Sequence, residues 1–180
     1  MDAGRFRGEV DQVSPEDRPG IAETVWPLVK ARVLSARLQV VGRGPTPAER
    51  TLVDKTGDAE LHADIPDPKS YLRQASVAVN PAVSGSGVNI KLVEYLSVGV
   101  PVVSTSRGMG GIHLLVGEDL LVADAPADFA DHIVRLLTSD ETAHRVAAGH
   151  QTAMRILDVR TSLATMASAL MNRRRYALLN

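Results

Sequence analysis

The 180-residue chain contains no cysteine. This excludes a disulfide framework and a cysteine-ligated metal site, and it fits a cytoplasmic protein. Acidic and basic residues nearly cancel to a formal net charge of −1, so the composition indicates no general attraction to nucleic acid or anionic membranes. No apolar run approaches the length of a membrane span, and residues 1–20 lack the apolar core of a signal peptide.

Short apolar runs alternate with helical patterns through most of the chain. Strands are predicted at residues 38–41, 60–62, 77–80, 101–104 and 120–122. Helices are predicted at residues 21–33, 47–56, 67–74 and 126–137, and in a segment from Ile90 through Leu96. This alternation favours an α/β fold with a doubly wound parallel sheet that is covered by helices on both faces.

The two ends of the chain differ from this alternating region, residues 21–138. Residues 1–20 hold charges, prolines and glycines without a hydrophobic period, and they predict a flexible N-terminal arm. Residues 139–180 predict C-terminal helices at 140–155 and 160–174.

Three glycine-rich turns follow three of the predicted strands, at residues 42–45, 85–87 and 108–111. In a parallel sheet these turns open on the same edge, where ligands of such folds bind. Their convergence predicts a nucleotide-type site.

The glycine-rich turn at residues 85–87 leads into the predicted helix that starts at Ile90. Free N–H groups at a helix N-terminus favour an anion, and Lys91 and Glu94 lie in the first turns of this helix. A cation and a carboxylate beside an anion site suggest a phosphate-bearing ligand with hydroxyl groups. Ile90, Val93 and Leu96 are expected to share one apolar face of the helix.

Residues 84–105 resemble the donor-site segment of group 1 (family 4) glycosyltransferases, which have the GT-B fold. Glu94 matches the second glutamate of the family's E-x7-E motif, and the first glutamate falls on Ser86. Further similar segments lie at residues 38–45, 67–81, 108–111 and 117–123, so that the resemblance spans residues 22–138 in the expected order.

The resemblance implies that residues 21–138 are a nucleotide-sugar-binding, Rossmann-like half of a GT-B enzyme. Such enzymes transfer a sugar from a nucleotide-sugar donor to an acceptor, usually with retention and without a metal or other cofactor. It implies catalytic roles for Lys91 and Glu94, with Lys91 near the donor diphosphate and Glu94 accepting both ribose hydroxyls. The implied donor-binding residues are Gly42, Gly44, Gly85, Ser86, Gly87, Asn89, Lys91 and Glu94.

Each of these residues also has a structural interpretation. Glu94 and Lys91 are equally typical of a solvated helix surface, and the glycines are typical of turns that need a positive φ. Asn89 suits either a phosphate donor or a helix cap. The loop at 108–111, with Ser104 and Thr105, is expected to contact the donor through backbone N–H groups.

The resemblance also indicates that parts of a complete GT-B enzyme are missing from this sequence. A GT-B enzyme has two domains, and the N-terminal acceptor domain has no counterpart in this sequence. The first strand of the donor domain is expected to be missing too, because residues 1–20 show no strand pattern. We therefore expect a fragment that works with a separate N-terminal acceptor domain or subunit.

Other classes of protein remain open on the sequence. A non-catalytic nucleotide-sugar-binding or partner module would keep the glycine turns and Glu94. A nucleotide-sugar epimerase needs a histidine or a carboxylate pair in the cleft, which the loops do not offer. A flavodoxin-like signalling domain would place acidic residues after its first strand, where this chain has Gly42, Arg43 and Gly44.

Overall fold

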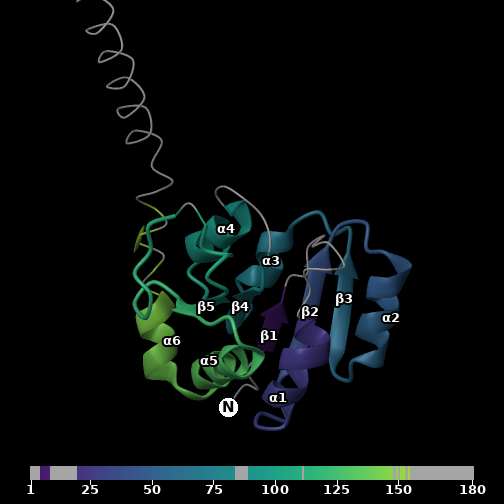
Figure 1. The fold of residues 1–180 in the computed structure, drawn as a ribbon. Helices are drawn as coiled ribbons and strands as arrows, with labels where there is room; N and C mark the ends of the chain where they lie inside the picture. Colours follow the sequence, from purple (N-terminus) through teal and green to yellow (C-terminus); the bar gives the residue numbers. More distant parts are fainter. Residues whose placement is uncertain are drawn as a thin grey trace, which may run out of the picture.

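The computed structural model describes residues 5–8, 20–83, 89–110, 112–147, 149, 151, 152 and 154. Its strands form one parallel six-stranded sheet in the order β3-β2-β1-β4-β5-β6 (Figure 1). The strands are β1 (Arg5–Gly8), β2 (Arg37–Gly42), β3 (Ala59–Ala63), β4 (Val77–Asn80), β5 (Val102–Ser104) and β6 (Leu121–Val122). This order reverses direction between β1 and β4, which confirms the prediction of a doubly wound sheet.

Strand β1 corrects the expectation that the first strand is missing. It lies inside the segment expected to be a flexible arm, and it pairs with β2 on one side and β4 on the other. Phe6 is in register with both Leu38 and Val77. The prediction was wrong because Arg-Phe-Arg-Gly has a single large apolar residue, whereas central parallel strands usually read as apolar runs. Pairing on both sides outweighs the weak local signal.

The helices follow the predicted positions closely. They are η1 (Ile21–Val25, a π-helix), α1 (Trp26–Lys30), α2 (Pro47–Lys55), α3 (Pro68–Leu72), α4 (Ile90–Val98), α5 (Pro126–Thr138) and α6 (Asp140–Ala147). Pro27 lies in the first turn of α1, the position where a helix tolerates proline. The helix predicted at residues 160–174 lies outside the described residues.

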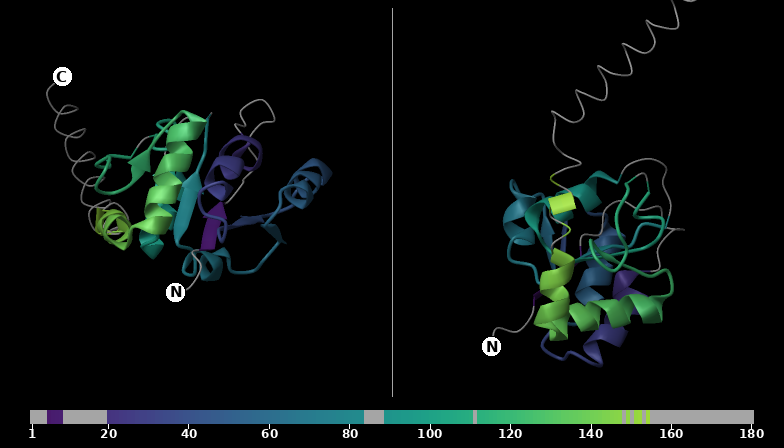
Figure 2. Two further views of the ribbon diagram at one scale, coloured as in Figure 1. Left: turned by 90° about the horizontal axis from the view of Figure 1, so that it is seen from below. Right: turned by 90° about the vertical axis from the view of Figure 1, so that its left-hand side faces the viewer.

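Two apolar cores sandwich the sheet. On one face, the helical segments η1 and α1 pack with α5 (Figure 2). Trp26, Val29 and Ile133 are buried in this core. On the other face, α3 and α4 cover β4 and β5. Val93 and Leu96 of α4 are buried as expected, but Ile90 is 71% exposed. Ile90 is the first residue of α4, so it projects beyond the edge of the core.

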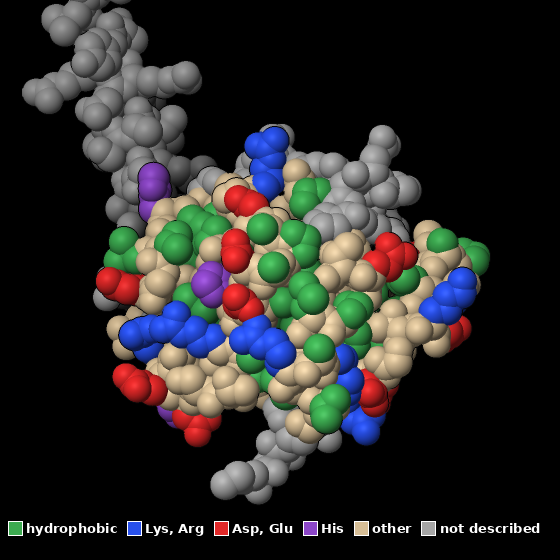
Figure 3. Space-filling model, turned by 60° about the horizontal axis from the view of Figure 1, so that its bottom comes forward, with side chains coloured by type: hydrophobic (Ala, Val, Ile, Leu, Met, Phe, Trp, Pro, Cys, Tyr) green, Lys and Arg blue, Asp and Glu red, His purple; other side chains and the backbone are tan. Residues whose placement is uncertain are grey.

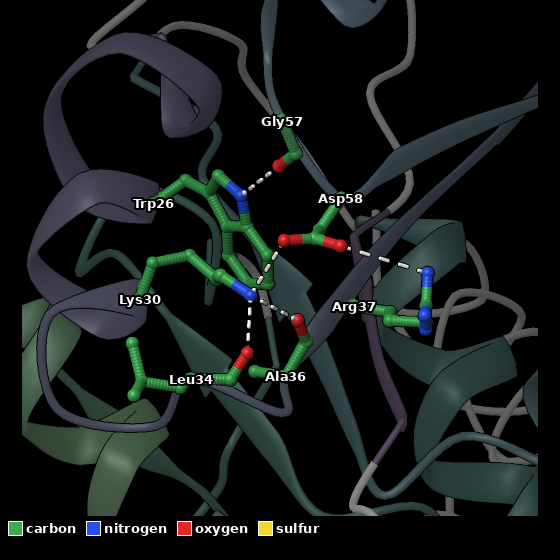
Figure 4. Close-up of polar contacts among 7 residues, drawn as sticks. All are labelled: Trp26, Lys30, Leu34, Ala36, Arg37, Gly57 and Asp58. Atoms are coloured by element: carbon green, nitrogen blue, oxygen red, sulfur yellow. Dashed lines mark hydrogen bonds and ion pairs between the residues drawn. The ribbon is translucent and has the colours of Figure 1, made fainter.

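Polar contacts join α1 to the turn before β3, at the amino ends of the strands (Figure 4). The Trp26 indole Nε1 donates to the Gly57 carbonyl at 3.1 Å, and Lys30 Nζ lies 2.7 Å from the Asp58 carboxylate. On the face that Figure 3 shows, acidic and basic side chains are interspersed, in keeping with the near-zero net charge.

Candidate functional site

A buried network of hydrogen bonds holds the carboxyl ends of β4 and β5. Asn80 is the last residue of β4, beside the point where the strand order reverses. Its Nδ2 donates to Ser104 Oγ at 3.1 Å and to the Gly108 carbonyl at 3.0 Å. Its Oδ1 accepts from Asn89 Nδ2 at 3.1 Å. Asn80 is only 5% exposed, so this side chain acts inside the protein.

Asn89 caps helix α4. Its Oδ1 accepts from the Leu92 backbone N–H at 3.2 Å, the usual contact of an N-cap side chain. Between the two roles that the sequence left open, the structure shows the cap. Since the same side chain also donates to Asn80, the N-terminus of α4 is tied to the end of β4.

The loop after β5 is held just as closely. Thr105 N donates to the Asn80 carbonyl at 3.1 Å, and Gly108 N donates to Thr105 Oγ1 at 3.0 Å. Ser106 N donates to Asp124 Oδ1 at 2.9 Å, and Gly110 N donates to the Arg107 carbonyl at 3.1 Å. Backbone N–H groups of this loop were expected to contact the donor. These four N–H groups are instead already engaged within the protein.

A glycine is required at position 108 because neighbouring side chains approach its backbone closely. A Cβ at this position would lie 2.5 Å from Ser104 Oγ and 2.6 Å from Asn80 Nδ2. Real Cβ atoms do not approach neighbours so closely, so a side chain would displace part of the network. The glycine therefore serves packing around Asn80.

Lys91 and Glu94 lie three residues apart in α4, on the same side of the helix. Glu94 is exposed. Lys91 Nζ is buried, which contradicts the interpretation of Lys91 as a solvated surface charge. A buried ammonium beside a helix N-terminus produces a strong local positive field, because the low dielectric screens it poorly.

Asp64 fixes the turn that contains Gly42 and Gly44. Gly44 has a φ of +54° and donates its N–H to Asp64 Oδ1 at 2.8 Å, while Asp64 N donates to the Gly42 carbonyl at 2.9 Å. Gly44 therefore needs the conformational freedom of glycine. The sequence analysis missed Asp64, although a carboxylate just after a predicted strand was the available signal.

Three of the expected donor-binding residues lie outside what the structure describes. Gly85, Ser86 and Gly87 fall outside the described residues. Within those that are described, no three histidine, cysteine or acidic side chains gather as metal ligands. In the same part of the chain, no helix has the length and apolar character needed to cross a membrane.

An apolar pocket lies beneath the turn of Gly42 and Gly44, between β2, β3 and α2. Glu49 is its one carboxylate, and this group already accepts from the Thr46 N–H at 2.7 Å in a capping box. The pocket therefore lacks an uncommitted acid or base, and we place the candidate chemistry at the N-terminus of α4.

Comparison with known proteins agrees with this geometry. Residues 12–139 match the sequence profile of the family described as "Glycosyl transferases group 1". No curated protein sequence matches the chain.

Solved structures of group 1 enzymes share the fold. TarM (S. aureus) aligns with a TM-score of 0.76 and 16% identity, over 92% of this chain and 35% of TarM. Anabaena Alr3699/HepE, solved in complex with UDP, aligns with a TM-score of 0.77 and 14% identity, over 94% of this chain and 49% of HepE. The C-terminal domain of the Francisella tularensis group 1 glycosyltransferase LpcC aligns with a TM-score of 0.67 and 15% identity, over 86% of this chain and 85% of the LpcC domain.

The chain thus spans half or less of the TarM and HepE chains, and most of the isolated LpcC domain. The family match covers more than half of the sequence, and the fold and the order of its glycine turns agree with it. The chain belongs to the group 1 glycosyltransferases.

Proposed function

We propose that this chain is the donor-binding domain of a group 1 glycosyltransferase and binds a nucleoside-diphosphate sugar. The observation that carries the proposal is the capped N-terminus of α4, with the buried Lys91 ammonium in its first turn. This helix end follows β4, at the point of strand reversal where doubly wound folds bind nucleotides. Helix dipole and ammonium together favour a diphosphate.

Lys91 and Glu94 have separate roles in this proposal. The Lys91 ammonium offsets negative charge that builds on the diphosphate as it leaves. The Glu94 carboxylate accepts both ribose hydroxyls, which its two oxygens suit. Both side chains project from the same side of α4, so one bound donor is able to meet both.

The glycine-rich turns are proposed to contact the donor through their own backbone groups. Gly42 and Gly44 form the turn after β2, at the carboxyl ends of the strands, and Gly85, Gly87 and Asn89 precede α4. Ser86 replaces a glutamate of the family motif, so a neutral hydroxyl is proposed to meet the transferred sugar.

The proposed reaction transfers the sugar with retention and without a metal. The bond between the sugar and the diphosphate oxygen breaks, and the diphosphate keeps the electron pair. The acceptor hydroxyl forms the new bond to the sugar, and its proton passes to the departing diphosphate oxygen. The acceptor site is supplied by a separate N-terminal domain or subunit, as the short span of this chain relative to TarM and HepE suggests.

A second candidate is a non-catalytic module that binds the nucleotide-sugar without transferring it. The same short span favours it. The two candidates differ in one measurement, because only the first yields a transferred or hydrolysed sugar when an acceptor domain is added.

The direct test is calorimetric titration of the chain with UDP-, GDP- and ADP-sugars, beside Glu94→Gln. We expect one nucleotide to bind, and we expect the variant to lose affinity for it about tenfold, because the amide accepts less strongly than a carboxylate. A folded chain that binds none of the three would overturn the proposed function.

A further inference from the structure

The side chain of Asn80 is the hub of the network described above. Both hydrogens of its amide group are donated, and its oxygen accepts from Asn89. Asn80 is nearly inaccessible, so it does not reach a ligand itself. Any effect of Asn80 on binding must therefore pass through the groups that it holds.

Two chain segments meet at Asn80. Through Asn89 it is connected to the Leu92 N–H, and so to the first turn of α4 that carries Lys91. Through the Gly108 carbonyl it is connected to the loop after β5. Neither connection is local, because Asn89 lies 9 residues and Gly108 lies 28 residues from Asn80 along the chain.

We propose that Asn80 is a positioning residue that sets the amino end of α4 against the loop after β5 and so places Lys91 for the donor diphosphate. This inference rests on the proposed donor site. It adds a residue outside the glycine turns and outside the motif of Glu94.

The chemistry at this position requires an amide. An alanine leaves Asn89 Nδ2 and the Gly108 carbonyl without their partner. Gly108 packs so closely on this amide that a Cβ there would lie 2.6 Å from Asn80 Nδ2, so removing the amide leaves a gap beneath the loop. The expected result is a tilt or loosening of the first turn of α4, while the sheet beneath it keeps its pairing.

The test compares Asn80→Ala with Ser104→Ala in the full chain. Ser104 is fully buried and also bonds to Asn80, but its loss leaves the connection from Asn80 through Asn89 to Leu92 intact. Asn80→Ser is a milder variant that keeps a hydroxyl in case Asn80→Ala fails to fold. Each protein is titrated with UDP and with uridine, which lacks the diphosphate.

We expect Asn80→Ala to weaken UDP binding about tenfold and to change uridine binding by less than about twofold. Ser104→Ala should keep the ratio of the UDP and uridine affinities. A purely structural role would change both ligands alike, because it acts through the unfolded fraction. An unchanged UDP affinity in a folded Asn80 variant would overturn the inference.

Hydrogen exchange at the Leu92 amide gives a second measurement that needs no ligand. Faster exchange in the Asn80 variant than in Ser104→Ala supports the positioning role, and equal protection overturns it. If the unaltered chain binds no nucleotide, the proposed function fails, and the exchange result still decides whether Asn80 positions α4.

Discussion

Lys30 Nζ lies 2.7 Å from the Asp58 carboxylate, and this contact joins α1 to the turn before β3. The ammonium also donates to the Ala36 carbonyl at 3.2 Å, so three segments meet at the amino ends of the strands. The hydrogen bond and charge of Lys30 lower the pKa of Asp58 below its ordinary value of 3.8. The candidate site lies at the opposite edge of the sheet.

This contact predicts a pH dependence of stability. Because the pKa of Asp58 is lower in the folded chain, the unfolded chain binds more protons near pH 3–4. The stabilisation is present above pH 3.8 and is lost as the pH falls through the folded pKa. In urea unfolding at pH 7 and pH 3, Asp58→Asn should lose less stability on acidification than the unaltered chain.

A side chain at position 108 should destabilise the fold by steric overlap. Gly108→Ala should lower the free energy of unfolding by about 1–3 kcal/mol, because the added methyl group overlaps Ser104 and Asn80. Gly57→Ala is a matched control, since a Cβ there meets no heavy atom of the described chain within 4 Å. The control should stay within about 0.5 kcal/mol in denaturant unfolding. Equal effects of the two substitutions would contradict the steric argument.

The third prediction concerns Lys91, whose ammonium should favour a nucleoside diphosphate over the nucleoside without phosphate. Lys91→Gln should weaken binding of the nucleoside diphosphate that the titration identifies about 10- to 100-fold and leave binding of its nucleoside nearly unchanged, because the ammonium is proposed to meet the diphosphate. Lys55→Gln, at the exposed end of α2, removes the same charge away from the site. Calorimetry that finds both variants equal to the unaltered chain would remove Lys91 from the donor site.

The hydrogen bonds of Asp124 lead to a prediction about the pKa of its carboxyl group. Hydrogen bonds from Ser106 N at 2.9 Å and Ser106 Oγ at 2.8 Å lower the pKa of the Asp124 carboxyl. Ser106→Ala removes the hydroxyl bond and keeps the backbone bond, so the pKa of Asp124 should rise part of the way toward 3.8. Carbon NMR of the Asp124 side-chain carboxyl group follows this shift in the variant and in the unaltered chain. A pKa of Asp124 that stays where it was would show that the hydroxyl has no part in the shift.

Local patterns predicted five of the six strands and most of the helices. Apolar runs such as 77–80 lie between turn residues, and Thr46 and Asp67 cap helices whose prolines mark the first turn. Strand β1 escaped prediction because its sequence is polar and its stability comes from two neighbours that are distant in the chain.

The site was predicted less completely than the fold. The position of Lys91 and Glu94 on α4 was visible in the sequence, but the burial of the Lys91 ammonium was not. Asn80 and Asp64 are polar residues at the ends of strands, and nothing near them in sequence shows what they bond. Their partners come from segments that only tertiary packing brings together.

The central place of β1 has a consequence for the order of assembly. Phe6 lies near the start of this sequence, but its partner Val77 follows β2, β3 and the four helical segments η1, α1, α2 and α3. Until β4 emerges, β1 has an open side with unpaired backbone groups, and such an edge is prone to pair with other chains. The pairing of β1 with β4 joins contacts of long sequence separation, which form slowly. Among the described strands, β1 is therefore the one separated by the longest stretch of sequence from its second neighbour.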